Sequence, residues 1–185
     1  MSTMTQNQLP FQLECKLEHQ ITQHLEFLEG AEFGKPRRGH PEGAVKYHIA
    51  DVLRNVDRFF IDSPDRPALR LIALLHDTFK YQVDSDRPRC GDNHHGMIAR
   101  RFAERFISDQ SVLDVLELHD EAYNAWQCGN RDGRWDKASR RALALLDRLG
   151  TNIDLYLAFY RCDNATEGKS QNSFDWFEQF VRDVS

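Results

Sequence analysis

At its most apolar point the chain reads Ala68-Leu69-Arg70-Leu71-Ile72-Ala73-Leu74-Leu75-His76-Asp77, a run that ends in an imidazole and a carboxylate. Such a run predicts a buried helix. A charged group at the end of a buried segment must be paired or must hold a metal ion. The dipeptide His76-Asp77 is therefore the first candidate for a functional site.

Helical periodicity continues on both sides of this run. Apolar residues recur at helical spacing over residues 11–29 and 44–60, which predicts one helix in each range. No stretch shows the alternation of a strand, so the predicted fold class is all-α. After the run we expect helices at about 94–106, 112–119, 135–149, 152–162 and 173–184, and loops at 31–43, 82–93 and 128–133.

Length and composition bound the organisation of the chain. A chain of 185 residues with 41% hydrophobic content is long enough for one domain with a core, and the length argues against two. We therefore predict a flexible N-terminus over residues 1–10 and a single domain over residues 11–185. The C-terminal aromatics would serve either the core or the face of a homodimer: Phe174, Trp176, Phe177 and Phe180.

Charge and cysteine content bear on compartment and partners. The formal net charge is −5, and Lys and Arg are spread along the chain, so no extended nucleic-acid surface is expected. The polar start lacks the pattern of a signal peptide, and no stretch reaches the roughly 18 apolar residues of a membrane span. Four widely spaced cysteines predict neither a zinc motif nor a disulfide scaffold. We therefore expect a cytoplasmic protein without membrane contact.

Three histidines other than His76 fall on apolar helical faces. His48 lies on the stripe of Val45 and Val52, His95 on that of Ala99, and His119 follows a run of buried-type residues. A single histidine in such a place is usually a hydrogen-bonded core residue. Together with aspartate, and without cysteine, they suit an octahedral site for a hard or borderline metal.

In this order, His48, His76-Asp77, His95, His119 and Asp163 resemble the metal-binding signature of the HD superfamily of phosphohydrolases. The resemblance covers roughly residues 39–168. The segments His40-Pro41-Glu42-Gly43 and His94-His95-Gly96 are similar to the HD domain of bacterial tRNA nucleotidyltransferases. The resemblance implies an HD-type helical bundle with a metal site in its core.

The resemblance also implies a ligand set. His48, His76, Asp77 and Asp163 would hold one divalent ion. His95 and His119 would add a second, with Asp77 bridging the two. The implied cofactor is therefore one or two ions of Mn, Fe, Ni, Co or Mg.

Two catalytic roles are implied as well. Asp77 would orient the reacting water, and Lys80 would neutralise a substrate phosphate. The lysine of the family's HD-x-G-K pattern is retained in His76-Asp77-Thr78-Phe79-Lys80, but Phe79 replaces the glycine.

Two assignments stay open. His94 competes with His95, because the doublet allows two registers. We prefer His95, which lies on the inward stripe of its predicted helix, whereas His94 lies off it. Asp147 competes with Asp163, because it also follows an apolar run. We prefer Asp163, which ends a helix that carries Leu155 and other apolar residues.

The implied activity is hydrolysis of a phosphoric ester by metal-activated water, and the family favours a nucleotide or a nucleic-acid end as the substrate. The expected partner is then a small phosphorylated molecule. Two alternatives remain: an HD-type di-iron oxygenase, which uses the same ligands, and a non-catalytic nucleotide-binding HD module with a structural metal.

Overall fold

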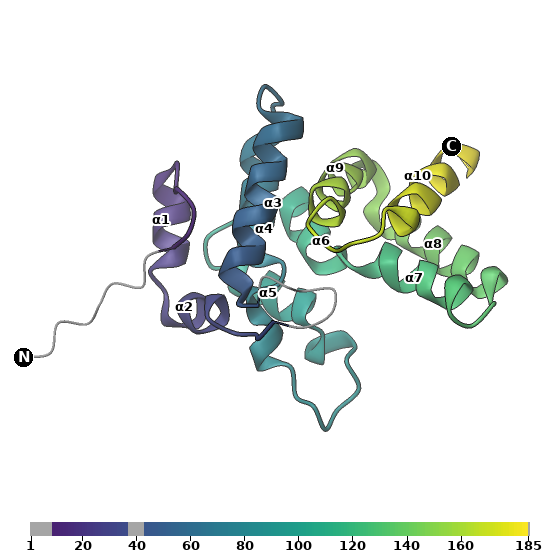
Figure 1. Ribbon diagram of the computed structural model, residues 1–185, viewed down its shortest axis with the longest axis horizontal. Coiled ribbons are helices and arrows are strands. Elements are labelled where there is room, and N and C mark those ends of the chain that lie inside the picture. The colour runs from purple at the N-terminus through teal and green to yellow at the C-terminus, as the bar shows by residue number, and fades with distance from the viewer. Residues whose placement is uncertain (1–8, 37–42, 185) are drawn as a thin grey trace, which may run out of the picture.

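The computed structural model describes residues 9–36 and 43–184, and within these ranges the chain is all-α with no strand (Figure 1). No described helix has both the length and the apolar character needed to cross a membrane. Residues 1–8, 37–42 and 185 lie outside the described residues. They include most of the predicted flexible N-terminus and the segment His40-Pro41-Glu42.

Ten α-helices and three short 3₁₀ helices make up the described chain. They are α1 (Lys16–Thr22), α2 (Leu25–Ala31), α3 (Val45–Phe60), α4 (Arg66–Leu75), η1 (Thr78–Gln82), η2 (Gly91–Asn93), α5 (His95–Ala103), α6 (Gln110–Leu118), α7 (Glu121–Asn130), α8 (Trp135–Leu149), η3 (Gly150–Asn152), α9 (Ile153–Asn164) and α10 (Asn172–Val184).

The apolar run forms α4, the central helix of the fold. It packs against α3, α6 and α9, while α1 and α2 lie on one side and α7, α8 and α10 on the other (Figure 1). Leu69 and all four residues Ile72–Leu75 are fully buried. This confirms the predicted buried helix and explains its composition, because α4 has neighbours on nearly every face.

A buried ion pair ties the N-terminal helices to α4. The Arg70 guanidinium donates to both carboxylate oxygens of Glu18 on α1, at 2.7 and 3.1 Å, and to the carbonyl of Gln12 at 2.9 Å. The partnership explains how an arginine fits within the most apolar run of the chain.

The prediction of one helix over residues 11–29 is wrong. The chain forms α1 and α2, which are separated at His24, where the backbone is extended with φ −72° and ψ 138°. The break lets the His24 ring pack against Phe102 of α5 and against Phe106, which follows α5, with ring centroids 5.8 and 4.9 Å away. It also leaves Leu25, expected on the apolar face, 75% exposed.

The predicted loop over residues 128–133 is also partly wrong, and α7 was not predicted. Helix α7 continues through Cys128 and Gly129 to Asn130, so the loop begins only at Arg131. The Trp135 ring covers Gly129 so closely that a Cβ there would lie 2.1 Å from a ring carbon. A glycine that reads locally as a helix breaker is thus required by the packing of α7 on α8.

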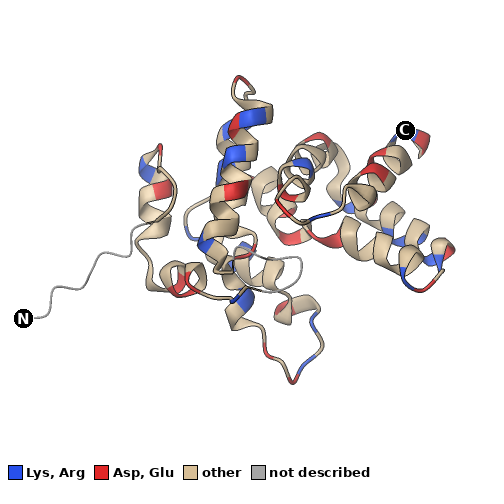
Figure 2. Cartoon of the chain, in the orientation of Figure 1, with Lys and Arg blue, Asp and Glu red and all other residues tan. Residues whose placement is uncertain are grey.

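The C-terminal aromatics belong to the core. Phe174 and Phe177 are buried, and Trp176 and Phe180 pack against them from partly buried positions. Lys and Arg are interspersed with Asp and Glu over the described helices (Figure 2). All four cysteines are free thiols.

Candidate metal centre

Three helices bring a first set of ligand-type side chains together at the end of α4. The Nε2 atom of His48, on α3, lies 3.2 Å from His76 Nε2 and 2.9 Å from Asp163 Oδ1 on α9. The same Asp163 oxygen is 3.7 Å from His76 Nε2. Asp77 Oδ2 completes the set at 3.8 Å from His48 and 3.7 Å from His76.

A second set of ligand-type side chains faces Oδ1, the other carboxylate oxygen of Asp77. His95, which begins α5, and His119, which caps α6, place their Nε2 atoms 3.0 Å apart. Both atoms are 3.6 Å from Asp77 Oδ1. One carboxylate therefore faces two groups of imidazoles, one with each oxygen, and both groups have the spacing of a metal site.

The same kind of hydrogen bond, to the backbone carbonyl three residues earlier, orients two of the imidazoles. Nδ1 of His76 donates to the carbonyl of Ala73, and Nδ1 of His119 donates to that of Leu116, both at 2.9 Å. A carbonyl only accepts, so Nδ1 carries the proton in each ring and Nε2 presents its lone pair to the centre. Such an outer hydrogen bond is the usual support of a histidine that binds a metal.

Burial and charge set the protonation states. Desolvation lowers the pKa of His76 and of His95 to about 3, although nearby carboxylates oppose the shift. Burial acts to raise the pKa of Asp77 and Asp163, but the ammonium groups of Lys80 and Lys169 and the surrounding imidazoles hold both well below the usual range. Burial acts to lower the pKa of His119, but the hydrogen bond with Asp77 and the nearby carboxylates raise it overall. Neutral imidazoles beside ionised carboxylates are the forms that bind metal, so metal binding would favour loss of a proton from His119.

Two lysines contact the carboxylates. Lys80 Nζ lies 2.5 Å from Asp77 Oδ2, and Lys169 Nζ lies 2.7 Å from Asp163 Oδ1. Lys80 was a sequence candidate, whereas Lys169 was not. It lies in the connection between α9 and α10, where no periodic pattern singles it out.

The structure separates the competing candidates. Nδ1 of His94 accepts from the backbone N–H of Gly96 at 3.2 Å, so its Nε2 carries the proton and donates to Asp120 Oδ2 at 3.2 Å. His94 thus caps α5, while His95 faces the centre. Asp147 is exposed on α8 and joins no ligand-type group among the described residues.

Asp120 is a residue that sequence reasoning missed. Its Oδ2 lies 3.9 Å from His95 Nε2, and with His94 and His95 it forms a third group of metal-binding spacing. Burial acts to raise the pKa of Asp120, but the hydrogen bond from His94 and the nearby imidazoles lower it overall. A signal was present, since His119-Asp120 repeats the dipeptide His76-Asp77 at the end of a second apolar helix.

Three contacts hold the supporting helices in place. The buried Asn55 side chain of α3 donates to the carbonyl of Cys162 on α9 at 2.9 Å, one residue before Asp163. The Tyr156 hydroxyl donates to the carbonyl of His119 at 3.2 Å and accepts from the backbone N–H of Ala122 on α7 at 3.1 Å. A Cβ on Gly96 would lie 2.4 Å from the Glu117 carbonyl oxygen, so α5 and α6 approach as closely as they do only with glycine there.

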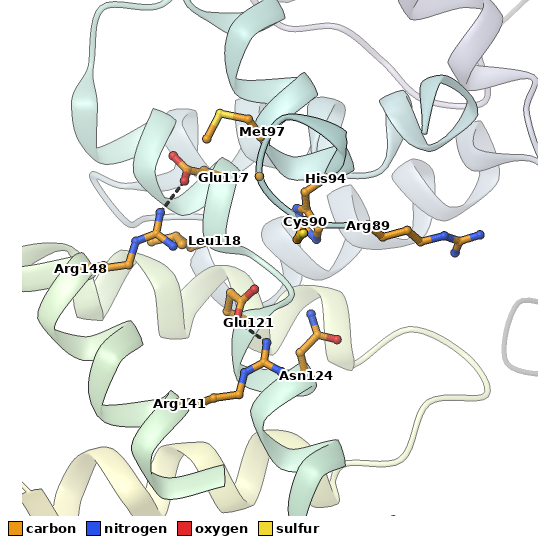
Figure 3. Close-up of a pocket in the computed structure, with 11 residues that line it drawn as sticks. Arg89, Cys90, His94, Met97, Glu117, Leu118, Glu121, Asn124, Arg141 and Arg148 are labelled. Atoms are coloured by element: carbon orange, nitrogen blue, oxygen red, sulfur yellow. Dashed lines mark hydrogen bonds and ion pairs between the residues drawn. The ribbon is translucent and has the colours of Figure 1, made fainter. Parts of the chain in front are cut away.

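A pocket of about 580 Å³ lies beside His94 (Figure 3). None of the six candidate ligands lines it, and His94 is linked to the centre through Asp120, whose Oδ2 lies 3.2 Å from His94 and 3.9 Å from His95. Arg141 pairs with Glu121 at 2.7 Å on one wall, and Arg148 pairs with Glu117 on another. Arg89 extends away from both pairs. The lining residues are Arg89, Cys90, Gly91, His94, Met97, Glu117, Leu118, Glu121, Asn124, Arg141 and Arg148.

Comparisons of the chain with protein-family models, with curated proteins and with solved structures found no significant match. A functional conclusion therefore rests on the residues and their geometry.

Proposed function

We propose that this chain is a metal-dependent phosphohydrolase with an HD-type dinuclear centre, acting on a small phosphorylated substrate such as a nucleotide or a nucleic-acid end. The observation that carries the proposal is the placement of Asp77 between two sets of imidazoles. Oδ2 faces His48 and His76, and Oδ1 faces His95 and His119, all within 3.8 Å. A carboxylate that bridges two ions needs this arrangement.

The donor set fits divalent ions. Four imidazoles and two carboxylates, with no thiolate, favour Mn, Fe, Co or Ni over Mg, which prefers carboxylate and water oxygens. The hydrogen bonds from His76 and His119 to backbone carbonyls keep the Nε2 lone pairs directed at the centre. Bound ions of this kind clamp phosphoryl oxygens and lower the pKa of water.

The residues of the chain supply orientation and charge. Asp77 holds the two halves of the centre together and accepts a hydrogen bond from a reacting water. Lys80, beside Asp77, provides a cation for a phosphoryl oxygen. We assign the rest of the substrate to the pocket next to His94, because Asp120 links His94 to His95 and the arginine–glutamate pairs of the pocket favour a polar occupant.

The first test is elemental analysis of gently purified protein together with a panel of phosphomonoesters and phosphodiesters, with added Mn, Ni, Co or Mg. Wild-type protein should hold close to two ions per chain and turn over at least one ester class. Asp77→Asn keeps the shape and removes the charge, so it should lose both ions and the activity. Asp147→Asn, on the exposed face of α8, is the matched control and should change neither.

The other outcomes are equally decisive. Iron-loaded protein that consumes oxygen with a substrate, and hydrolyses no ester, would make the chain an oxygenase. Bound metal without turnover under any condition would make it a non-catalytic module. Protein that takes up no metal would overturn the proposal, because its central residue would then bridge nothing.

A further inference from the structure

The connection between α9 and α10 places Lys169 beside the proposed metal centre. Lys169 Nζ lies 2.7 Å from Asp163 Oδ1, and the same oxygen lies 2.9 Å from His48 Nε2. The side chain keeps 21% of its surface exposed, so it stands at the rim with one side toward solvent.

This connection is held by its own hydrogen bonds. The Asn164 side chain donates to the carbonyl of Ser170 at 3.1 Å, and the Gln171 side chain donates to the carbonyl of Asn164 at 2.9 Å. Gly168, immediately before the lysine, has φ 80°, a left-handed conformation that favours glycine. Lys169 is therefore presented by an ordered turn.

Lys80, on η1, contacts the other carboxylate of the first ligand set. Its Nζ contacts Asp77 Oδ2, and that oxygen lies 3.8 Å from His48 Nε2. Two ammonium groups from distant segments thus each touch a carboxylate of the proposed ligand set, and both carboxylate oxygens lie within 3.8 Å of His48 Nε2.

The charges explain what the two cations would do when ions are bound. A divalent ion at Asp163 repels the ammonium of Lys169 and competes with it for the carboxylate. The ammonium has three donors, so it can keep one contact with the carboxylate and direct another at a ligand above the centre. Two ions and two lysines carry more positive charge than Asp77 and Asp163 neutralise.

We propose that Lys169 acts with Lys80 to bind the terminal phosphoryl group of the substrate, and that the centre selects phosphomonoesters over phosphodiesters. The proposal rests on the proposed function. A terminal phosphate is a dianion near neutral pH and offers three oxygens, whereas a diester carries one charge and two substituents. The excess of positive charge therefore favours the monoester.

Binding of inorganic phosphate to the metal-loaded protein tests this without requiring turnover. Calorimetric titration should show phosphate affinity reduced about tenfold to a hundredfold in Lys169→Met, the loss expected for one charge-assisted hydrogen bond. Lys169→Arg keeps the charge and should stay within about threefold of wild type. Lys137→Met removes an exposed lysine of α8 and is the control, which should match wild type.

Metal content and kinetics separate the possible outcomes. Lys169→Met should retain its ions, and its kcat/KM should fall more for a phosphomonoester than for a phosphodiester. Unchanged phosphate affinity in Lys169→Met, or loss of metal from that variant, would overturn the role of Lys169. Wild-type protein that holds metal but binds no phosphate would also overturn it. Wild-type protein without metal would instead defeat the proposed function itself.

Discussion

Replacement of Gly96 by alanine should remove one of the two proposed ions and leave the other. The added Cβ would lie 2.4 Å from the Glu117 carbonyl oxygen and 3.1 Å from its carbon. To reach ordinary contact distance, α5 has to withdraw from α6 by about 1 Å. His95 precedes Gly96, and His119 follows Glu117 by two residues, so the movement separates this pair.

The expected magnitude follows from the tolerance of metal sites. Ligand distances in such sites hold to within about 0.2 Å, so a shift of this size should weaken the ion at His95 and His119 by about tenfold to a hundredfold or more. The ion at His48, His76 and Asp163 does not depend on this contact. Overpacking costs about 1–3 kcal/mol, which corresponds to a fall in Tm of about 2–12 °C for a chain of this size.

Metal titration with elemental analysis is the assay, together with thermal unfolding. Gly96→Ala should hold one ion per chain where wild type holds two. Gly133→Ala is the control, because that position also disfavours a side chain, with φ 67°, but nothing lies within 4 Å of its Cβ. It should lose some stability and keep both ions. Two ions bound to Gly96→Ala with wild-type affinity would refute the role assigned to the α5–α6 contact.

Three further predictions follow from single contacts. Asp77→Asn should release both ions, because it removes the only charge shared by the two sets; circular dichroism should show helix content unchanged, and retention of either ion would contradict the bridging role. Glu18→Gln should lower the free energy of unfolding by about 1–3 kcal/mol, since Arg70 loses its buried anion and keeps only the more exposed Glu14, 3.0 Å away. Urea unfolding measures this, and a loss below about 0.5 kcal/mol would show that Glu14 is a sufficient partner. Tyr156→Phe should lower the free energy of unfolding by about 1–3 kcal/mol, because the carbonyl of His119 and the backbone N–H of Ala122 lose a buried partner. The variant should bind its second ion more weakly than wild type in a metal titration.

Periodicity predicted the surroundings of the centre well. The apolar spacing about His48 and His119 placed both rings inside the protein, and both are buried. The end of the apolar run likewise placed His76-Asp77 at the end of α4. These predictions depend on which face of a helix a residue occupies, and that is a local property of the chain.

Other features could not be read from local pattern. The break at His24 exists because the rings of Phe102 and Phe106 pack against His24, and α7 tolerates Gly129 because Trp135 covers it. Lys169 reaches Asp163 only through a turn between two helices. Each of these depends on partners that are distant in the sequence or set by the path of a loop.

The sequence by itself determined an all-α chain, a buried central helix and a set of histidines and aspartates that point inward. Only the tertiary structure decided which oxygen of Asp77 faces which imidazoles, that His95 rather than His94 faces the centre, and that Asp120 and Lys169 lie beside it. The physical reason is that helical periodicity specifies the direction of a side chain relative to its own helix axis. Distances between side chains depend on how the helices pack, and here close contacts such as that of Gly96 with Glu117 set them.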